Sequence, residues 1–288
     1  MQCRVYPGFF ELRLADAAGT KSPANHHSIN SNPMNTSKWI EHFLKNRLHR
    51  TEPDWQAPHT LGPYAVSRLV PSLEQFRLGD GGGPACLIAH NAERFRGQSE
   101  EMRTLVDLWF AEEREHSRLL GCAVRRFGGR QIDSHWSFTA FCVCRRVLGV
   151  RFELDVLLLT EIVSTAYYRL LRRHAGDQPL RDMCSLIFRD ETGHVAFHRD
   201  RLAGKRRSPA VLRSLLWEAQ FWVLGHGAAT MLRLNHCRGL QALGPNRAEY
   251  FREVRLEIGR FIRRLGREQV LRDGETIPVG AVRPVTVK

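Results

Sequence analysis

LVDLWFAEEREHSRLL, at residues 105–120, and LRDMCSLIFRDETGHVAFH, at residues 180–198, are the two stretches that decide the fold of this chain. In both, large apolar residues recur every three or four positions, which is the period of a helix that buries one face. The buried stripe of each carries a Glu-x-x-His sequence, Glu113 with His116 and Glu191 with His194. Residues three apart lie on one helix face, so both helices direct a carboxylate and an imidazole into the core.

Helical periodicity continues over most of the remaining chain. We expect a short helical stretch over residues 71–78 and six longer helices, over 84–96, 99–127, 152–174, 180–202, 209–235 and 246–267. The connection between the second and third of these contains a further apolar piece, 138–148. No stretch alternates with period two for long enough to form a sheet. The predicted fold class is therefore all-α, a four-helix bundle with additional C-terminal helices over residues 71–270.

The two ends of the chain differ in composition from the predicted bundle. Residues 18–36 are rich in Ser, Asn, Pro and His and have no apolar period, which is typical of disorder. We expect an irregular, partly disordered segment over residues 1–70, with an amphipathic stretch over 38–48 that Ser37 caps. One interpretation is that Met34 is the true start of the protein. Residues 271–288 are expected to form a tail.

Glu161 is the next informative residue, because it lies on the apolar stripe of the expected helix 152–174 with no basic residue beside it on that stripe. A carboxylate buried there would be protonated or strongly destabilising unless a cation compensated it. The chain turns near residue 177, so antiparallel packing places Glu161 opposite residue 193, between Glu191 and His194. A metal ion is the economical explanation for this group.

A further carboxylate is expected opposite the first Glu-x-x-His sequence. A turn near residue 97 places that sequence opposite residues 79–82, where Asp80 is the nearest carboxylate. Glu74 reaches the same level only if the glycine run 81–83 bulges or breaks the helix, since glycine is a poor helix former. We therefore favour Asp80 and keep Glu74 as the alternative.

Two carboxylate-bearing helices and two Glu-x-x-His helices supply the ligand set of a dinuclear carboxylate bundle. Carboxylates can bridge two cations and neutralise their charge, while one imidazole per metal leaves positions open to oxygen. We predict a site for two metal ions with six ligands, namely Asp80, Glu113, His116, Glu161, Glu191 and His194.

WFAEEREH, at residues 109–116, resembles the W-x-A-E-E-x-x-H helix of the soluble acyl-carrier-protein desaturases, and DETGH, at residues 190–194, resembles their D-E-x-x-H sequence. The likeness covers residues 74–200 and rests on these motifs. It implies a ferritin-like four-helix bundle with an oxygen-activating di-iron centre, for which manganese is the alternative metal. The ligands it implies are Glu113, His116, Glu161, Glu191 and His194.

The chain departs from that family in two ways. The first-helix glutamate of the desaturases has no clean equivalent here, only Asp80 or Glu74. The glycine-rich stretch before Pro84 is also unlike a desaturase helix. Either departure would suit a shorter ligand, a mononuclear site or a site that has decayed.

Several other polar residues fall on the same helices. His198 lies one turn beyond His194 and is either a further nitrogen ligand or, more commonly for such a residue, a hydrogen-bonded core histidine. Asp190 precedes Glu191 and could orient a ligating imidazole through its other ring nitrogen. We expect the remaining polar aromatic residues near this level or on the fifth helix to be structural: Tyr167, Tyr168, His226 and His236.

The formal net charge of +13 comes mostly from arginine and indicates attraction to an anionic partner: RNA, lipid headgroups or an acidic carrier protein. The plainer interpretation is a protein with solvated arginine-rich helix faces. Seven cysteines in no framework spacing favour a reducing, cytoplasmic location, with peripheral membrane association as the alternative. Leu215–Leu232 is expected to be a buried helix rather than a membrane span, because it contains Glu218 and His226.

The leading functional hypothesis is a non-haem di-iron oxidoreductase that activates dioxygen and oxidises a small-molecule or acyl substrate, using an external electron donor. One alternative is iron handling or peroxide reduction without an organic substrate. Another is a metal-free helical binding protein with a basic surface. A homodimer is one expected assembly.

Overall fold

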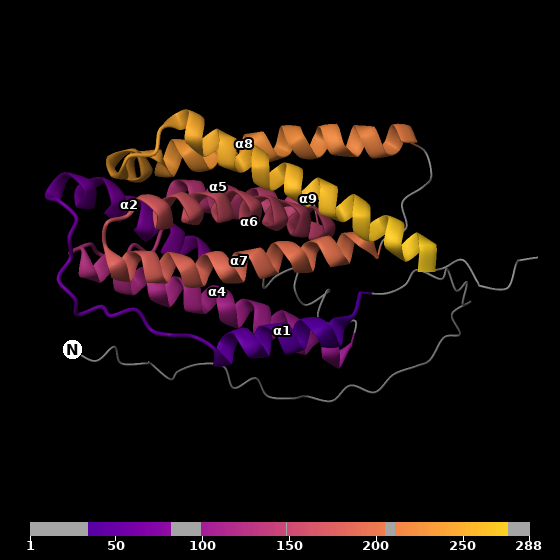
Figure 1. Ribbon diagram of the computed structural model, residues 1–288, viewed down its shortest axis with the longest axis horizontal. Helices are drawn as coiled ribbons and strands as arrows, with labels where there is room; N and C mark the ends of the chain where they lie inside the picture. The colour runs from indigo at the N-terminus through magenta and orange to yellow at the C-terminus, as the bar shows by residue number, and fades with distance from the viewer. Residues whose placement is uncertain (1–33, 82–98, 148, 205–210, 276–288) are drawn as a thin grey trace, which may run out of the picture. The chain divides into compact units, whose positions relative to one another are not determined.

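The computed structural model describes residues 34–81, 99–147, 149–204 and 211–275, all within one compact unit, Ser31–Lys288. These residues form eight helices and no strands (Figure 1), which confirms the all-α prediction. The helices are α1 Thr36–Leu48, α2 Pro63–Gly81, α4 Glu100–Arg126, α5 Trp136–Val147, α6 Gly149–His174, α7 Gln178–Ala203, α8 Val211–Leu243 and α9 Arg247–Glu275. The helix expected over 84–96 lies outside the described residues.

Helix α2 is the main correction to the sequence prediction. We expected the chain before residue 71 to be irregular apart from the stretch 38–48, and only 71–78 to be helical, but α2 begins at Pro63. Proline is favoured at the first helical position, where its missing N–H has no partner to lose. Pro71 lies inside the helix at a cost in hydrogen bonding. Burial of Leu69 and Leu73, both fully buried, compensates for that cost and keeps the helix continuous.

Both ends of the predicted bundle are also revised. The amphipathic stretch near residue 38 is helix α1, but Asn35 rather than Ser37 caps it, since the Asn35 side chain accepts a hydrogen bond from the backbone N–H of Lys38 at 3.0 Å. At the other end, α9 continues to Glu275. Within the described residues, helices therefore occupy part of the segment 1–70 that we predicted to be irregular. They also occupy part of the predicted tail 271–288.

Four helices surround the level of the predicted site. Helix α2 packs against α4, α6 packs against α7, and α4 contacts α7 (Figure 1). Both pairs are antiparallel, because Asp155 near the start of α6 meets Arg201 near the end of α7, and Arg77 of α2 accepts a hydrogen bond from Ser117 of α4. Helices α8 and α9 cover α6 on one side, and α1 lies along α4 on the other.

A buried ion pair links the end of α4, the start of α7 and the chain between α1 and α2. Arg126, in the last turn of α4, contacts Asp177 at 2.8 Å, and the two side chains are 4% and 0% exposed. Asp177 also caps α7 by accepting a hydrogen bond from the backbone N–H of Leu180. Arg126 donates to the backbone carbonyls of Trp55 and Ala57, which ties the chain between α1 and α2 to the bundle.

Among the described residues, no helix is both long and apolar enough to cross a membrane.

Candidate metal centre

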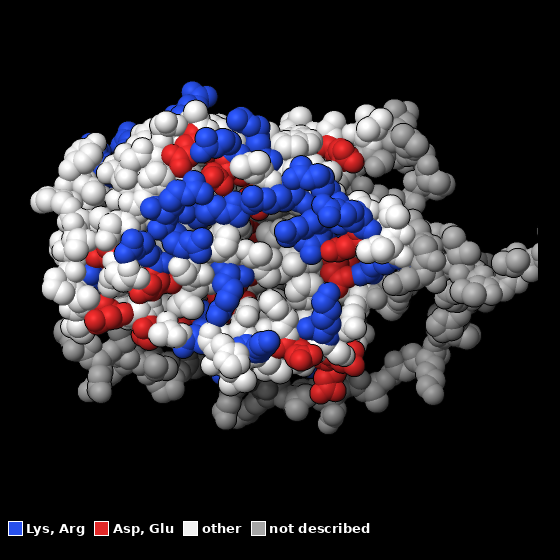
Figure 2. Space-filling model, viewed as in Figure 1, with Lys and Arg blue, Asp and Glu red and all other residues white. Residues whose placement is uncertain are grey.

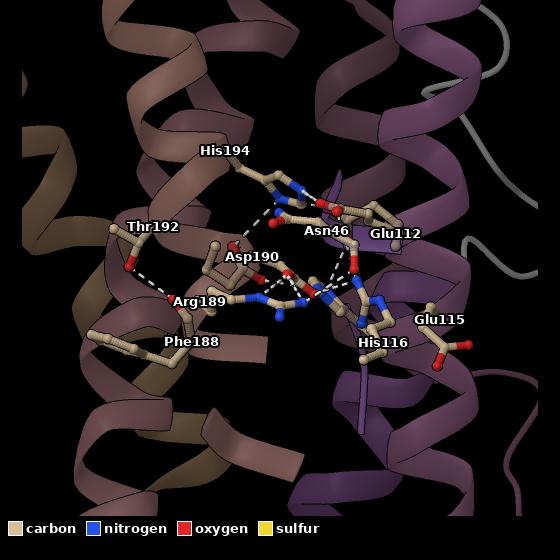
Figure 3. A network of polar contacts seen from close by, with 12 residues as sticks. Asn46, Glu112, Glu115, His116, Phe188, Arg189, Asp190, Thr192 and His194 are labelled. Atoms are coloured by element: carbon tan, nitrogen blue, oxygen red, sulfur yellow. Dashed lines mark hydrogen bonds and ion pairs between the residues drawn. The ribbon is translucent and has the colours of Figure 1, made fainter. Parts of the chain in front are cut away.

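The six predicted ligands come from four helices and meet in the middle of the unit. Asp80 lies near the end of α2, Glu161 on α6, and the two Glu-x-x-His sequences on α4 and α7. His116 and His194 are both 0% exposed. Figure 3 shows the polar network around these histidines, with α4 and α7 facing each other across it.

The side chains form two triads that share one carboxylate. Ligand atoms of Asp80, Glu113 and His116 lie within 4.8 Å of one another, as do those of Glu113, Glu161 and His194. Glu113 therefore stands between the two triads.

Glu191 occupies the equivalent central position on α7. Its Oε1 is 3.8 Å from His116 Nδ1, and its Oε2 is 3.9 Å from His194 Nδ1. Two central carboxylates and one terminal carboxylate at each end match the layout in which carboxylates bridge a pair of cations.

The two histidines are held by reciprocal hydrogen bonds to carboxylates that precede the central glutamates. His116 Nε2 lies 3.1 Å from Asp190 Oδ2, and His194 Nε2 lies 3.0 Å from Glu112 Oε2 (Figure 3). A carboxylate at Nε2 accepts the ring proton and leaves the Nδ1 lone pair free to bind a metal. The crossed pattern gives both imidazoles the same orientation relative to the centre.

Glu112 and Asp190, the outer carboxylates, share a third partner. Arg50, which follows α1, lies 2.5 Å from Asp190 and 3.6 Å from Glu112. Its guanidinium offsets part of the negative charge of the two carboxylates. Asp190 contacts His116, and Glu112 contacts His194. Sequence reasoning anticipated that Asp190 would orient an imidazole but missed Glu112, although Glu112 precedes Glu113 as Asp190 precedes Glu191. No pattern in the sequence identified Arg50.

Among the described residues, several inward-facing polar atoms lack a well-aligned hydrogen bond, although His194 Nδ1 lies 3.1 Å from Glu113 Oε1. These atoms are buried and comprise Asp80 Oδ2, Glu161 Oε2, Glu191 Oε2, His116 Nδ1 and His194 Nδ1. Buried polar atoms without partners are costly, so several that converge on one point indicate a group that would satisfy them. Four carboxylates would neutralise two divalent cations, and the mixture of carboxylate and imidazole suits iron or manganese. The residues present therefore fit a dinuclear site.

Electrostatics in the metal-free centre lead to the same conclusion. Burial, with the nearby Glu113 carboxylate, raises the pKa of Asp80 to about 8. Burial and Glu113 also raise the pKa of Glu191 well above its usual range. Burial would raise the pKa of Glu113 as well, but the neighbouring His116 and His194 rings lower it instead. Without a cation, protons must supply the positive charge that these carboxyls need.

The pKa values of the two histidines are also raised. Burial alone would lower the pKa of His116, but Asp190 and Glu113 raise it well above the ordinary value. His194 behaves in the same way through Glu112 and Glu113. Metal binding would displace the protons held by these groups, because a ligating histidine must be neutral and a ligating carboxyl must be ionised.

His198 differs from the other two histidines in what contacts its outer nitrogen. Arg201 Nη2 lies 3.2 Å from His198 Nδ1 and 3.0 Å from Asp155 Oδ1. A guanidinium can only donate, so His198 accepts through Nδ1. Burial lowers the pKa of His198, and its neutral ring must then carry the proton on Nε2. Nε2 lies 3.3 Å from Glu161 Oε2, so His198 directs an N–H toward that carboxylate rather than a lone pair toward a metal.

The structure also distinguishes Asp80 from Glu74. Glu74 Oε1 accepts a hydrogen bond from the backbone N–H of Arg130 at 3.0 Å, at the opposite end of the α2–α4 pair. At Gly81 a Cβ would lie 2.6 Å from Ser117 Oγ, so this glycine permits close approach of α2 to α4. Close approach allows the short aspartate side chain to reach the centre.

An aromatic wall closes the side of the centre that faces α1. Trp109 packs edge-on to His198 with ring centroids 5.3 Å apart, and Phe43 of α1 lies 5.8 Å from the His194 ring. Gly193 lets α1 approach, since a Cβ there would be 2.5 Å from His42 Nε2. These contacts shield the centre from water, which strengthens the electrostatic interactions within it.

Three of the four tyrosines and histidines that we expected to be structural make ordinary core hydrogen bonds. Tyr167 and His236 both hydrogen bond to Ser72, at 2.7 and 2.9 Å, and His226 contacts the backbone carbonyl of Trp222. The Tyr168 hydroxyl is buried and has no hydrogen-bond partner among the described residues. Burial raises the pKa of Tyr168 well above its ordinary value, and the Asp80 and Glu191 carboxyls raise it further.

Comparison with known proteins gives no match to this chain, whether by family model, curated sequence or solved structure.

Proposed function

We propose that this chain is a non-haem di-iron oxidoreductase built on a ferritin-like four-helix bundle. The observation that carries the proposal is the pair of buried triads that share Glu113, with both inner imidazole nitrogens lacking a well-aligned hydrogen bond. A structural polar core would instead satisfy its own donors and acceptors. When bound, the iron pair would supply dioxygen activation and electron transfer, which no protein side chain here can supply.

The chain's own residues would bind and orient the metal pair. The metals would be held by the central Glu113 and Glu191, by Asp80 and Glu161 at either end, and by the two histidines. Glu112 and Asp190 would hold the histidines in the tautomer that presents Nδ1, since each accepts the Nε2 proton. The aromatic wall would exclude water from the centre.

Metal content provides the primary test. The purified untagged chain, loaded anaerobically with iron(II), is expected to hold about two iron ions, as dinuclear carboxylate bundles do. A Glu113→Ala/Glu191→Ala variant should lose them. A matched Glu115→Ala/Asp182→Ala variant removes two carboxylates from the same helices but away from the centre, and it should retain the iron. An iron-free wild type would overturn the proposal.

Oxygen reactivity then separates an oxidoreductase from an iron-handling protein. The loaded chain should oxidise about two iron(II) ions per chain on mixing with dioxygen and stop until an electron donor is added. Continued oxidation of excess iron(II) without a donor would instead indicate iron handling.

A further inference from the structure

Helix α8 exposes a long apolar stripe that no described helix covers. Leu216, Val223 and Leu234 are 61%, 71% and 66% exposed. The exposed residues at alternating steps of four and three are Leu216, Gln220, Val223, Gly227, Thr230 and Leu234. This is the spacing of a helix that presents one seam to a partner helix. Leu224 and Met231, 44% and 51% exposed, lie beside it.

The stripe is too large to be ordinary surface. Its apolar side chains leave on the order of 600 Å² exposed per chain, at the upper limit of apolar patches on monomeric proteins. Two such stripes together reach roughly 1,200 Å², the lower bound for a specific interface. The seam from Leu216 to Leu234 contains no charged residue, although the chain carries a formal charge of +13.

The order of residues along the seam is self-complementary. If two α8 helices cross antiparallel about residue 225, Leu216 of one lies opposite Leu234 of the other. Gln220 then faces Thr230, a polar pair, and Val223 faces Gly227. No described atom lies within 4 Å of a Cβ built at Gly227, so no contact among the described residues accounts for a glycine there. A glycine inside a helix costs about 1 kcal/mol relative to alanine, and room for the partner's Val223 would offset that cost.

We propose that α8 is a homodimer interface, in which the seams of two copies pack antiparallel about a twofold axis near residue 225. An isologous contact of this kind closes on itself and limits assembly to a dimer. A lipid surface is a weaker explanation, because membrane-surface helices carry Lys and Arg along the edges of the apolar face. The stretch Leu215–Leu232 contains no Lys or Arg, although Arg233 directly follows it. The proposal does not depend on the metal centre.

Light scattering of the full chain at micromolar concentration tests the proposal. We expect the mass of two chains for the wild type and of one chain for Leu216→Glu and for Leu234→Lys. The double variant Leu216→Glu/Leu234→Lys should restore the dimer, because antiparallel pairing puts each glutamate opposite a lysine. Val270→Glu, on an equally exposed residue of α9, should remain dimeric.

A second variant guards against misfolding as an explanation. Gly227→Leu enters open space in the single chain and favours the helix, so the helical circular dichroism should be maintained while the dimer weakens. A monomeric wild type would overturn the proposal, as would a dimer that survives Leu216→Glu. Failure of the double variant to restore the dimer would exclude the antiparallel pairing. Binding of a monomer to lipid vesicles through this stripe would assign it to a membrane instead.

Discussion

Arg50 connects the outer carboxylates on α4 and α7 with a single guanidinium. It lies 2.5 Å from Asp190 and 3.6 Å from Glu112, the groups that fix the two imidazoles. Removing a residue that orients metal ligands typically costs about 10- to 100-fold in metal affinity. We therefore expect Arg50→Met to lower iron(II) or manganese(II) affinity by that factor, as measured by competition with a chelator. Arg47→Met, an exposed arginine one turn earlier, is the matched control and should leave the affinity unchanged.

His198 and His194 are predicted to behave differently when replaced by glutamine. Glutamine can accept from Arg201 and donate to Glu161, as His198 does, but it is a poor substitute for an imidazole ligand. We expect His198→Gln to retain about two metal ions per chain and His194→Gln to lose at least one, by mass spectrometry of metal content. Equal loss from both variants would show that His198 is a ligand.

The metal-free chain should lose stability as the pH rises. Folding raises the pKa of Asp80 to about 8 and raises those of Glu191, His116 and His194 as well. A raised folded-state pKa means that folding takes up protons, so this stabilisation is complete below the unfolded pKa and is lost as the pH approaches the folded one. The lowered pKa of Glu113 affects stability only at pH values near and below the pKa that this carboxyl has in the unfolded chain.

Thermal unfolding of the metal-free chain should therefore show a falling Tm between about pH 6.5 and pH 8, since below the ordinary histidine pKa of 6.5 the lowered pKa values of His198 and His236 act in the opposite direction. Asp80→Asn removes one of the titrating groups and should flatten the slope. Metal should raise the Tm most at the alkaline end, because the ligands there are already deprotonated. A Tm that rises across this window would contradict the assignment of these protons.

At the scale of helices, the sequence predicted those features that depend on residues close to one another in the chain. The periodicity of α4 and α7 placed Glu113 and Glu191 on buried stripes, since that pattern depends only on residues of one helix. The turn near residue 177 then located Glu161 at the correct level, because antiparallel packing follows from a short connection. Helix α2 was predicted too short because Pro71 is a local breaker, and only tertiary burial of its neighbours overrides it.

Contacts between distant segments could not be inferred in this way. Arg50 reaches Asp190 from a stretch with no periodic pattern, and Arg201 of α7 pairs with Asp155 of α6. Only the arrangement of helices in space brings such pairs together. The sequence predicted which six side chains lie near one another, whereas their orientation required the structure.

The buried pair between α4 and α7 should contribute far more stability than an exposed pair of the same type. Arg126→Ala would leave Asp177 buried without its cation and remove two hydrogen bonds to the chain before α2. Breaking a buried pair in this way costs about 3–5 kcal/mol. Arg118→Ala, whose partner Glu52 is 51% exposed, should cost less than about 1 kcal/mol. Urea unfolding of both variants measures the difference, and equal costs would show that the Arg126 site is open to solvent.

Across the whole unit, positive charge collects along α9. Figure 2 shows Lys and Arg side chains forming a broad band over this face, with few acidic groups between them. We call the exposed arginines of α9 the basic band; they are Arg247, Arg252, Arg255, Arg263, Arg264 and Arg267. Other arginines beside α9 are neutralised, since Arg169 pairs with Glu253 and Glu257 and Arg173 pairs with Glu249 and Glu253. The uncompensated charge of the band therefore favours the anionic partner expected from the net charge.

Salt dependence tests whether the basic band binds an anion as a unit. With a single-stranded RNA oligonucleotide as the probe, log affinity should fall linearly with log salt, by about 0.7 per phosphate contact. Replacing Arg263, Arg264 and Arg267 with serine should lower the affinity and reduce that slope by roughly 2. Serines at Arg47, Arg103 and Arg114, exposed on α1 and α4, change the net charge equally and should have a smaller effect. Equal losses would mean that net charge alone attracts RNA, whereas binding of anionic vesicles but not RNA would assign the band to lipid headgroups.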